Sequence, residues 1–105
     1  MYAIVRQYAY DAAKHAAVGQ ALSDAQALHA GQPGYAGSVV IDDGQRMTAV
    51  NLWETEEAAA AGRSAIGEQV QRLLEPLMAG ASELIAVGEV VASDLRDLEQ
   101  RREQP

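Results

Sequence analysis

The strand-forming segments of this 105-residue chain are apolar on both faces. A sheet with one face in water usually alternates apolar and polar side chains along each strand. In residues 2–10 both alternate sets are mostly apolar or aromatic, and the same holds in residues 83–92. Two helices can cover only one face of such a sheet. The pattern therefore predicts a second cover, and an isologous second copy of the chain is the simplest one, which makes a homodimer the expected assembly.

Four strands are predicted from the aromatic and β-branched content of the sequence and from its turn residues. They cover residues 2–10, 35–42, 45–54 and 83–92. Between the second and third strands, Asp43-Gly44 predicts a hairpin with a type I′ turn, which needs positive φ at both central residues. The pairing implied by this turn puts two sets of side chains on opposite faces: Val39, Ile41, Val50 and Leu52 on one, and Val40, Met47, Ala49, Asn51 and Trp53 on the other.

Two helices are predicted between the strands. Asp11 is the expected N-cap of a helix over about 12–30, and Thr55 is the expected N-cap of the second helix. Gly62 is expected to break or bend this second helix, because glycine costs about 1 kcal/mol relative to alanine in a helix interior. Pro76 is expected to kink it or fray its end, since proline lacks the N–H for the helical hydrogen bond.

The element order βαββαβ, with two right-handed crossovers around a hairpin, predicts an α+β ferredoxin-like fold. Its sheet is expected to be four-stranded and antiparallel, in the order 4-1-3-2. Residues 1–93 are assigned to this single domain. Residues 94–105 form a charged tail, and a tail helix capped by Ser93 is one interpretation of it.

Composition excludes several classes of function. The chain has no cysteine, which excludes disulfides, thiolate metal sites and cysteine nucleophiles. Its net charge is −7 and its basic residues are scattered apart from Arg101 and Arg102, so neither a nucleic acid nor an anionic lipid surface is an expected partner. No stretch approaches the roughly 20 apolar residues that span a bilayer. We expect a cytoplasmic protein with no metal or flavin cofactor.

Three segments carry a resemblance to a known family. They are VRQY at the end of the first strand, QPGYAG before the hairpin and NLWETEEAAA after it. Together they resemble the antibiotic biosynthesis monooxygenase-like family of dimeric α/β barrels over about residues 1–92. Members of this family include cofactor-independent oxygenases that convert polyketide phenols to quinones, haem-degrading enzymes, and many proteins with no assigned reaction. The fold therefore decides little about the chemistry.

The resemblance implies a monooxygenase that acts on a small aromatic or phenolic molecule without a cofactor. Of the residues used by the oxygenases, only Trp53 is matched outright. They also carry an asparagine one alternation before the position of Asn51, and a tyrosine early on the next helix; these places hold Ala49 and Ala59 here. The alternative is a non-catalytic dimeric barrel that binds an apolar small molecule or serves as an accessory subunit.

The haem-degrading relatives carry a different set of residues. They have an asparagine in the first strand, and a tryptophan and a histidine on the second helix. The corresponding places here hold Val5, Gly62 and Arg72. Haem degradation is therefore not expected.

Three side chains are candidates for a site, and the two histidines are considered beside them. Trp53 either fills space under the second helix or forms a stacking wall for an aromatic ligand. Asn51 either bonds to neighbouring backbone or points at a ligand, because an unsatisfied buried amide costs about 1–3 kcal/mol. Arg6 either pairs across a dimer interface or faces a cavity, where it holds a phenolate or carboxylate. His15 and His29 lie about 21 Å apart on one helix and cannot share a metal; His29 is expected to be a capping or surface residue rather than a base.

Overall fold

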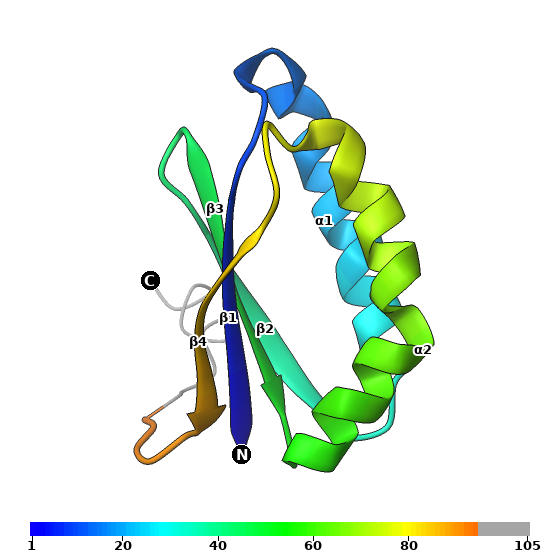
Figure 1. The fold of residues 1–105 in the computed structure, drawn as a ribbon, viewed down its shortest axis with the longest axis vertical. Coiled ribbons are helices and arrows are strands. Elements are labelled where there is room, and N and C mark those ends of the chain that lie inside the picture. The colour runs from blue at the N-terminus through cyan, green and yellow to red at the C-terminus, as the bar shows by residue number, and fades with distance from the viewer. Residues whose placement is uncertain (95–105) are drawn as a thin grey trace, which may run out of the picture.

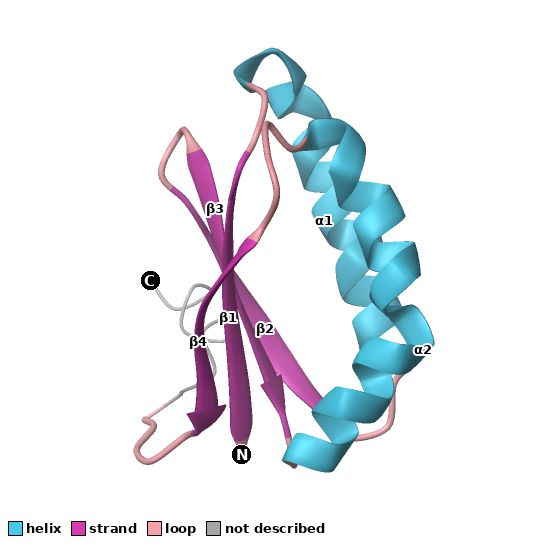
Figure 2. Cartoon of the chain, viewed as in Figure 1, coloured by secondary structure: helices cyan, strands magenta, loops and turns pink. Residues whose placement is uncertain are grey.

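The computed structural model describes residues 1–94 and has two layers, a four-stranded antiparallel sheet and two helices on one side of it (Figures 1 and 2). The strands are β1 Tyr2–Ala9, β2 Tyr35–Asp42, β3 Arg46–Trp53 and β4 Glu83–Glu89. The main helices are α1 His15–Ala30 and α2 Glu56–Leu74, with the short 3₁₀ segments η1 Ala12–Lys14 and η2 Glu75–Leu77. The strand order β2-β3-β1-β4 confirms the predicted ferredoxin-like fold.

α2 begins where the sequence predicts, whereas Asp11 caps the 3₁₀ segment η1 and α1 begins only at His15. The Asp11 carboxylate accepts a hydrogen bond of 3.0 Å from the Ala13 N–H, and Thr55 Oγ1 accepts one of 3.0 Å from the Ala58 N–H. α2 ends at Leu74 and gives way to η2, which contains Pro76. β4 is shorter than predicted and ends at Glu89. The predicted tail helix falls on residues 95–105, outside the described residues.

Gly62 does not interrupt α2, and the prediction of a break there is wrong. A β-carbon at Gly62 would lie 2.7 Å from Cζ3 of Trp53 and closer still to Cη2. The glycine is therefore explained by the close approach of the helix backbone to the indole ring. The cost of a helical glycine is offset by the packing of a large aromatic side chain that is only 3% exposed.

The hairpin turn also differs from its prediction. Within residues 1–94 no residue other than glycine has a positive φ, and Gly44, with φ 95°, is the only one of the two expected turn residues that does. Asp42 pairs with Met47, so the loop is Gly44-Gln45 and β3 begins at Arg46. The register moves by two residues from the expected one. Because side chains alternate with a period of two, both faces of the sheet keep their predicted members.

The sheet face away from the helices is apolar over most of its length. In the register of the sheet one row across it consists of Val39, Val50, Val5 and Ala86, and the next row of Gly37, Leu52, Ala3 and Gly88. We call these two rows the open face. Val39 is 47% exposed there. The third row contains the exposed Ile41 beside Thr48 and Gln7, which share a hydrogen bond of 3.1 Å, so the open face becomes mixed in polarity toward the hairpin.

A β-bulge modifies the alternation in β4. The register with β1 shifts between Val5 and Arg6, which leaves Ile85 without a direct partner. Leu84 and Val87 consequently lie opposite Arg6 and Ile4.

Among the described helices, none is both long and apolar enough to cross a membrane.

Candidate functional site

A cavity of about 1060 Å³ lies between the helix side of the sheet and the helices. β1 contributes Ile4, Arg6 and Tyr8, and β3 contributes Ala49, Asn51 and Trp53. In the register of the sheet Trp53 lies opposite Tyr2, so the distance along β1 from Trp53 to Tyr8 is about 20 Å at 3.3 Å per residue. The structure therefore brings all three predicted site residues, Arg6, Asn51 and Trp53, to one wall of one cavity.

Trp53 both packs and lines the cavity. Its ring lies against Gly62 of α2 and contacts Tyr35 of β2 edge-on, with ring centroids 5.5 Å apart and planes at 74°. The imidazole ring of His29 is 6.1 Å away on a third side. The indole is thus fixed by neighbours from α2, β2 and α1. A ring held in this way offers a rigid apolar surface to a ligand.

Asn51 has an uncommitted side-chain amide. It is half-buried between Ile4 of β1 and Ser38 of β2 in the register of the sheet. Ser38 Oγ accepts a hydrogen bond of 3.2 Å from Gln26 of α1. Within residues 1–94 the Asn51 amide makes no hydrogen bond. Its donors and acceptor are therefore available to a polar group in the cavity.

Arg6 faces the cavity rather than the open face. Its Nη1 donates a weak hydrogen bond of 3.4 Å to Ser82 Oγ, and no carboxylate in residues 1–94 pairs with it. This orientation does not fit the expected ion pair across an interface between two sheets. Arg63 of α2 also lines the cavity without a carboxylate partner among the described residues. Arg6 and Arg63 thus bring two cations to a cavity whose lining also includes the carboxylates of Glu68 and Glu75.

Two further cavity residues were missed by sequence reasoning. Tyr8 is 6% exposed, and its hydroxyl has no hydrogen-bond partner in residues 1–94. Burial, reinforced by the negative charge of Asp42, raises the pKa of the Tyr8 phenol, which keeps it protonated and able to donate. The parity of β1 was a usable signal, because Tyr8 lies two residues from Arg6 and therefore on the same face.

His29 lines the cavity and also bonds to the backbone of its own helix near the C-terminal end. It is half-buried, and its Nδ1 lies 2.8 Å from the carbonyl oxygen of Ala25. Helical spacing was the available signal, since His29 follows the buried Ala25 by four residues and thus shares its inward stripe.

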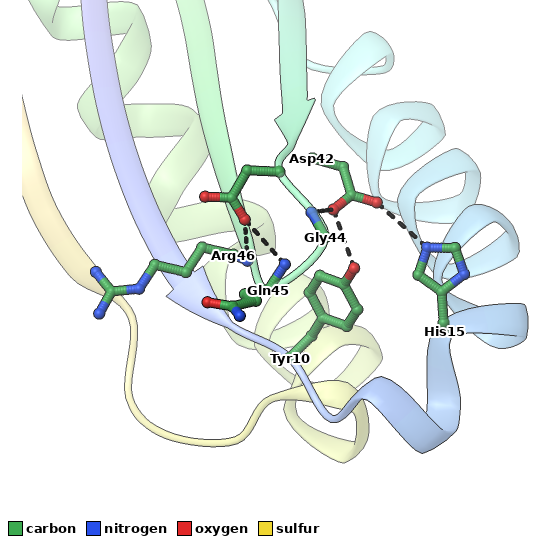
Figure 3. A network of polar contacts seen from close by, with 7 residues as sticks. Tyr10, His15, Asp42, Gly44, Gln45 and Arg46 are labelled. Carbon is green, nitrogen blue, oxygen red and sulfur yellow. Dashed lines mark hydrogen bonds and ion pairs between the residues drawn. The ribbon is translucent and has the colours of Figure 1, made fainter.

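A polar network closes the hairpin end of the molecule (Figure 3). Asp42 accepts hydrogen bonds of 3.0 Å from the Tyr10 hydroxyl and 2.8 Å from the Gly44 N–H, and lies 3.3 Å from His15 Nε2. These contacts, with the Gly44 bond the largest, hold the pKa of Asp42 below its ordinary value. The network joins the hairpin to the start of α1, which is a structural role. Among residues 1–94, no cluster of three or more histidine, aspartate or glutamate side chains could hold a metal ion.

No protein-family model matches the chain, and no curated protein is detectably similar to it in sequence. Solved structures are similar to it in fold. A protein from Nitrosomonas europaea assigned as an antibiotic biosynthesis monooxygenase superposes with a TM-score of 0.74 at 18% identity, over 88% of this chain and 100% of the other. One from Caulobacter crescentus with the same assignment gives 0.73 at 18% identity, over 87% and 90%.

The cofactor-independent oxygenase SnoaB from Streptomyces nogalater gives a TM-score of 0.68 at 16% identity, over 88% of this chain and 97% of its own. At these identities the similarity establishes the fold alone. The architecture is that of the antibiotic biosynthesis monooxygenase-like structures, as the sequence motifs predicted.

Proposed function

We propose that the protein binds a small aromatic molecule with an acidic hydroxyl group in this cavity and oxidises it with molecular oxygen, without a cofactor. The observation that carries the proposal is the composition of the sheet wall. The rigid ring of Trp53, the uncommitted amide of Asn51 and the guanidinium of Arg6, which has no carboxylate partner among the described residues, line the same wall in that order, with Arg6 opposite Ala49. A fold shared with a structure named as a cofactor-independent oxygenase supports the same reaction class.

In this scheme each residue has one task. Trp53 stacks against the aromatic ring of the substrate. Asn51 donates a hydrogen bond to a substrate oxygen, and Arg6 stabilises the negative charge on that oxygen. An ionised phenol gives up an electron to dioxygen more readily than a neutral one. One oxygen atom then replaces two hydrogens on a ring carbon to form a carbonyl group, and the other leaves as water.

Ala49 and Ala59 favour a second candidate function. Both line the cavity, and they stand where the resembling oxygenases carry an asparagine and a tyrosine. A chain without these groups is suited to binding an aromatic molecule without transforming it, or to acting as an accessory subunit. Ligand binding without oxygen consumption would favour this alternative.

We also propose that two copies pack through their open faces. Val39, Val50 and Leu52 contribute to an apolar surface that the helices do not reach. Large uncovered apolar patches mark interaction sites in soluble proteins. A self-complementary pairing would leave each cavity on the outer, helix side of its own sheet.

The test combines binding with turnover. Trp53 is the only tryptophan, so quenching of its fluorescence reports directly on the occupied cavity. We expect hydroxyanthraquinones to quench it, and anthrones to be consumed with matching uptake of oxygen. Arg6→Met should weaken binding of the ionised ligand about tenfold or more, because a charged hydrogen bond is worth about 1.5–3 kcal/mol.

Arg46→Met is the matched control. Arg46 lies on the opposite side of the sheet, where its Nη1 donates a hydrogen bond of 3.0 Å to Gln7. Its loss should leave binding unchanged. Equal effects of the two arginine substitutions would contradict the assignment of Arg6, and the absence of any quenching would contradict the cavity as a binding site.

A further inference from the structure

His29 brings an imidazole ring with one unbonded nitrogen to the Trp53 end of the cavity. Its Nδ1 lies 2.8 Å from the carbonyl oxygen of Ala25. A carbonyl oxygen can only accept, so Nδ1 carries the hydrogen of this bond. In the neutral ring Nε2 therefore keeps a free lone pair, and it has no hydrogen-bond partner within residues 1–94. This is the protonation state that a base requires.

Neighbouring rings hold the imidazole in place. The ring centroid of Tyr35 lies 5.6 Å from that of His29, and the centroid of Trp53 lies 6.1 Å away. Tyr35 and Trp53 also contact each other, so the three rings form one packed group. Together with the bond to Ala25 these contacts restrict rotation of the imidazole. A base positioned in this way does not have to be ordered when a ligand arrives.

The charges around the cavity favour the anion that such a base would create. Besides His29, the titratable side chains at the cavity are Tyr35 in contact with its ring, and Arg6, Tyr8, Arg63, Glu68 and Glu75 in the lining. Glu68 is already paired with Arg72 at 3.0 Å. Arg6 and Arg63 have no carboxylate partner among the described residues. Glu75 is the one lining carboxylate without a partner among the described residues, so the two arginines leave the lining with one net positive charge for a ligand that loses a proton.

We infer that His29 is the general base of the cavity, and that its Nε2 removes the proton from the hydroxyl group of the aromatic ligand. This inference rests on the proposed function. In the step, the ligand O–H bond breaks, the proton moves to Nε2, and the electron pair stays on the ligand oxygen. No electron leaves the ligand, so the step needs no oxidant. The imidazolium later returns its proton to solvent.

The experiment uses a hydroxyanthraquinone as the probe, with the full-length protein. The probe is already oxidised and cannot turn over, and its phenolate absorbs at longer wavelength than its phenol. Near neutral pH we expect the bound probe to be largely ionised. His29→Gln keeps a side-chain N–H for the Ala25 carbonyl but has no basic nitrogen. It should reduce the ratio of ionised to neutral bound probe about tenfold or more.

Oxygen uptake provides the second measurement. His29→Gln should lower the rate about 10²-fold. His29→Ala should regain activity when free imidazole is added, which a merely structural role would not produce. His15→Gln is the matched control, because His15 lies in the network at the hairpin end and should change neither measurement.

The outcomes separate the two proposals. Ionisation of the probe that depends on His29, without oxygen uptake, supports the base and refutes the oxygenase. Oxygen uptake that His29→Gln leaves unchanged refutes the base and supports the oxygenase. If His29→Gln lowers only the unfolding temperature, the imidazole is a packing residue and the inference is overturned. If the probe does not bind to the wild-type protein, the cavity is not the site and both proposals are overturned.

Discussion

The helices cover one face of the sheet and leave the other open, and the two faces differ in where their polar side chains lie. On the face that the helices cover, β1 presents Arg6, and β3 presents Asn51 beside it. On the face that no helix covers, the same two strands present Val5 and Val50. The covered face also carries the buried side chains of Tyr8, Met47 and Trp53, so its polar groups stand within an apolar wall. Under the proposed function a ligand meets these polar groups, and a second copy of the chain meets the apolar rows of the open face.

The energetics of the two faces support this reading. A half-buried amide or guanidinium without a partner carries a desolvation cost, which a ligand oxygen removes when it binds. The partly exposed valines of the open face behave in the opposite way, because only another apolar surface can remove them from water. The two faces therefore call for different partners. The following substitutions test whether they behave independently.

The largest effect is expected from a charge on the open face. In Val39→Asp two carboxylates would be buried without partners in the proposed dimer, at a cost of about 3 kcal/mol or more for each copy. Light scattering at tens of micromolar should then give the mass of one 11.2 kDa chain instead of two. Ser23→Asp adds the same charge at an exposed position of α1 and should leave the dimer intact. A wild-type protein that is itself monomeric would contradict the proposed assembly.

A smaller effect is expected from one methyl group on the helix side. Gly62→Ala places a β-carbon against the Trp53 ring, and overpacking of this kind costs about 1–3 kcal/mol. Gly19→Ala is the same change in α1, where nothing lies within 4 Å of the added carbon. It should stabilise the fold by up to about 1 kcal/mol. Urea unfolding measures both, and changes of the same sign would refute the contact between Gly62 and Trp53.

The smallest effect is expected in the acid dependence of stability. The pKa of Asp42 is lowered in the folded state, chiefly by the hydrogen bond from the Gly44 N–H. Its contribution is therefore present above the ordinary aspartate pKa of about 3.9 and is lost as the pH falls through the folded value.

Asp42→Asn should flatten this part of the curve of unfolding temperature against pH. Asp24→Asn, which alters a carboxylate of α1 outside the network, is the control. An unchanged acid limb in Asp42→Asn would show that the network contributes nothing to the attachment of the hairpin to α1.

The sequence predicts the fold and the two faces because both depend on periodicity. Asn51 and Trp53 lie two residues apart on one strand, so their side chains are on the same face whatever the register of the hairpin. The orientation of Arg6 follows from the same rule but was weighed as an interface charge, since the sequence does not show which face the helices cover. Within residues 1–94 the absence of a partner for Tyr8 depends on side chains distant in the chain.

The prediction for Gly62 was wrong, and that for His29 was incomplete, for a common reason. Local rules treat glycine as a helix breaker and a histidine near a helix end as a cap. Both residues also contact Trp53, which belongs to another element. Contacts of this kind arise from tertiary packing, which overrides local propensity and leaves no mark in the neighbouring sequence.

The register of the β2–β3 hairpin limits how this gene can change in length. Two codons gained or lost at Gly44-Gln45 would alter the loop and leave every side chain of β3 on its present side. A single codon has to be taken up by a longer loop or a bulge, because a one-residue slip of β3 against β1 would turn Asn51 outward and bring Val50 under the helices. The pocket lining and the surface proposed for assembly therefore keep their places only while the change in length stays within the loop.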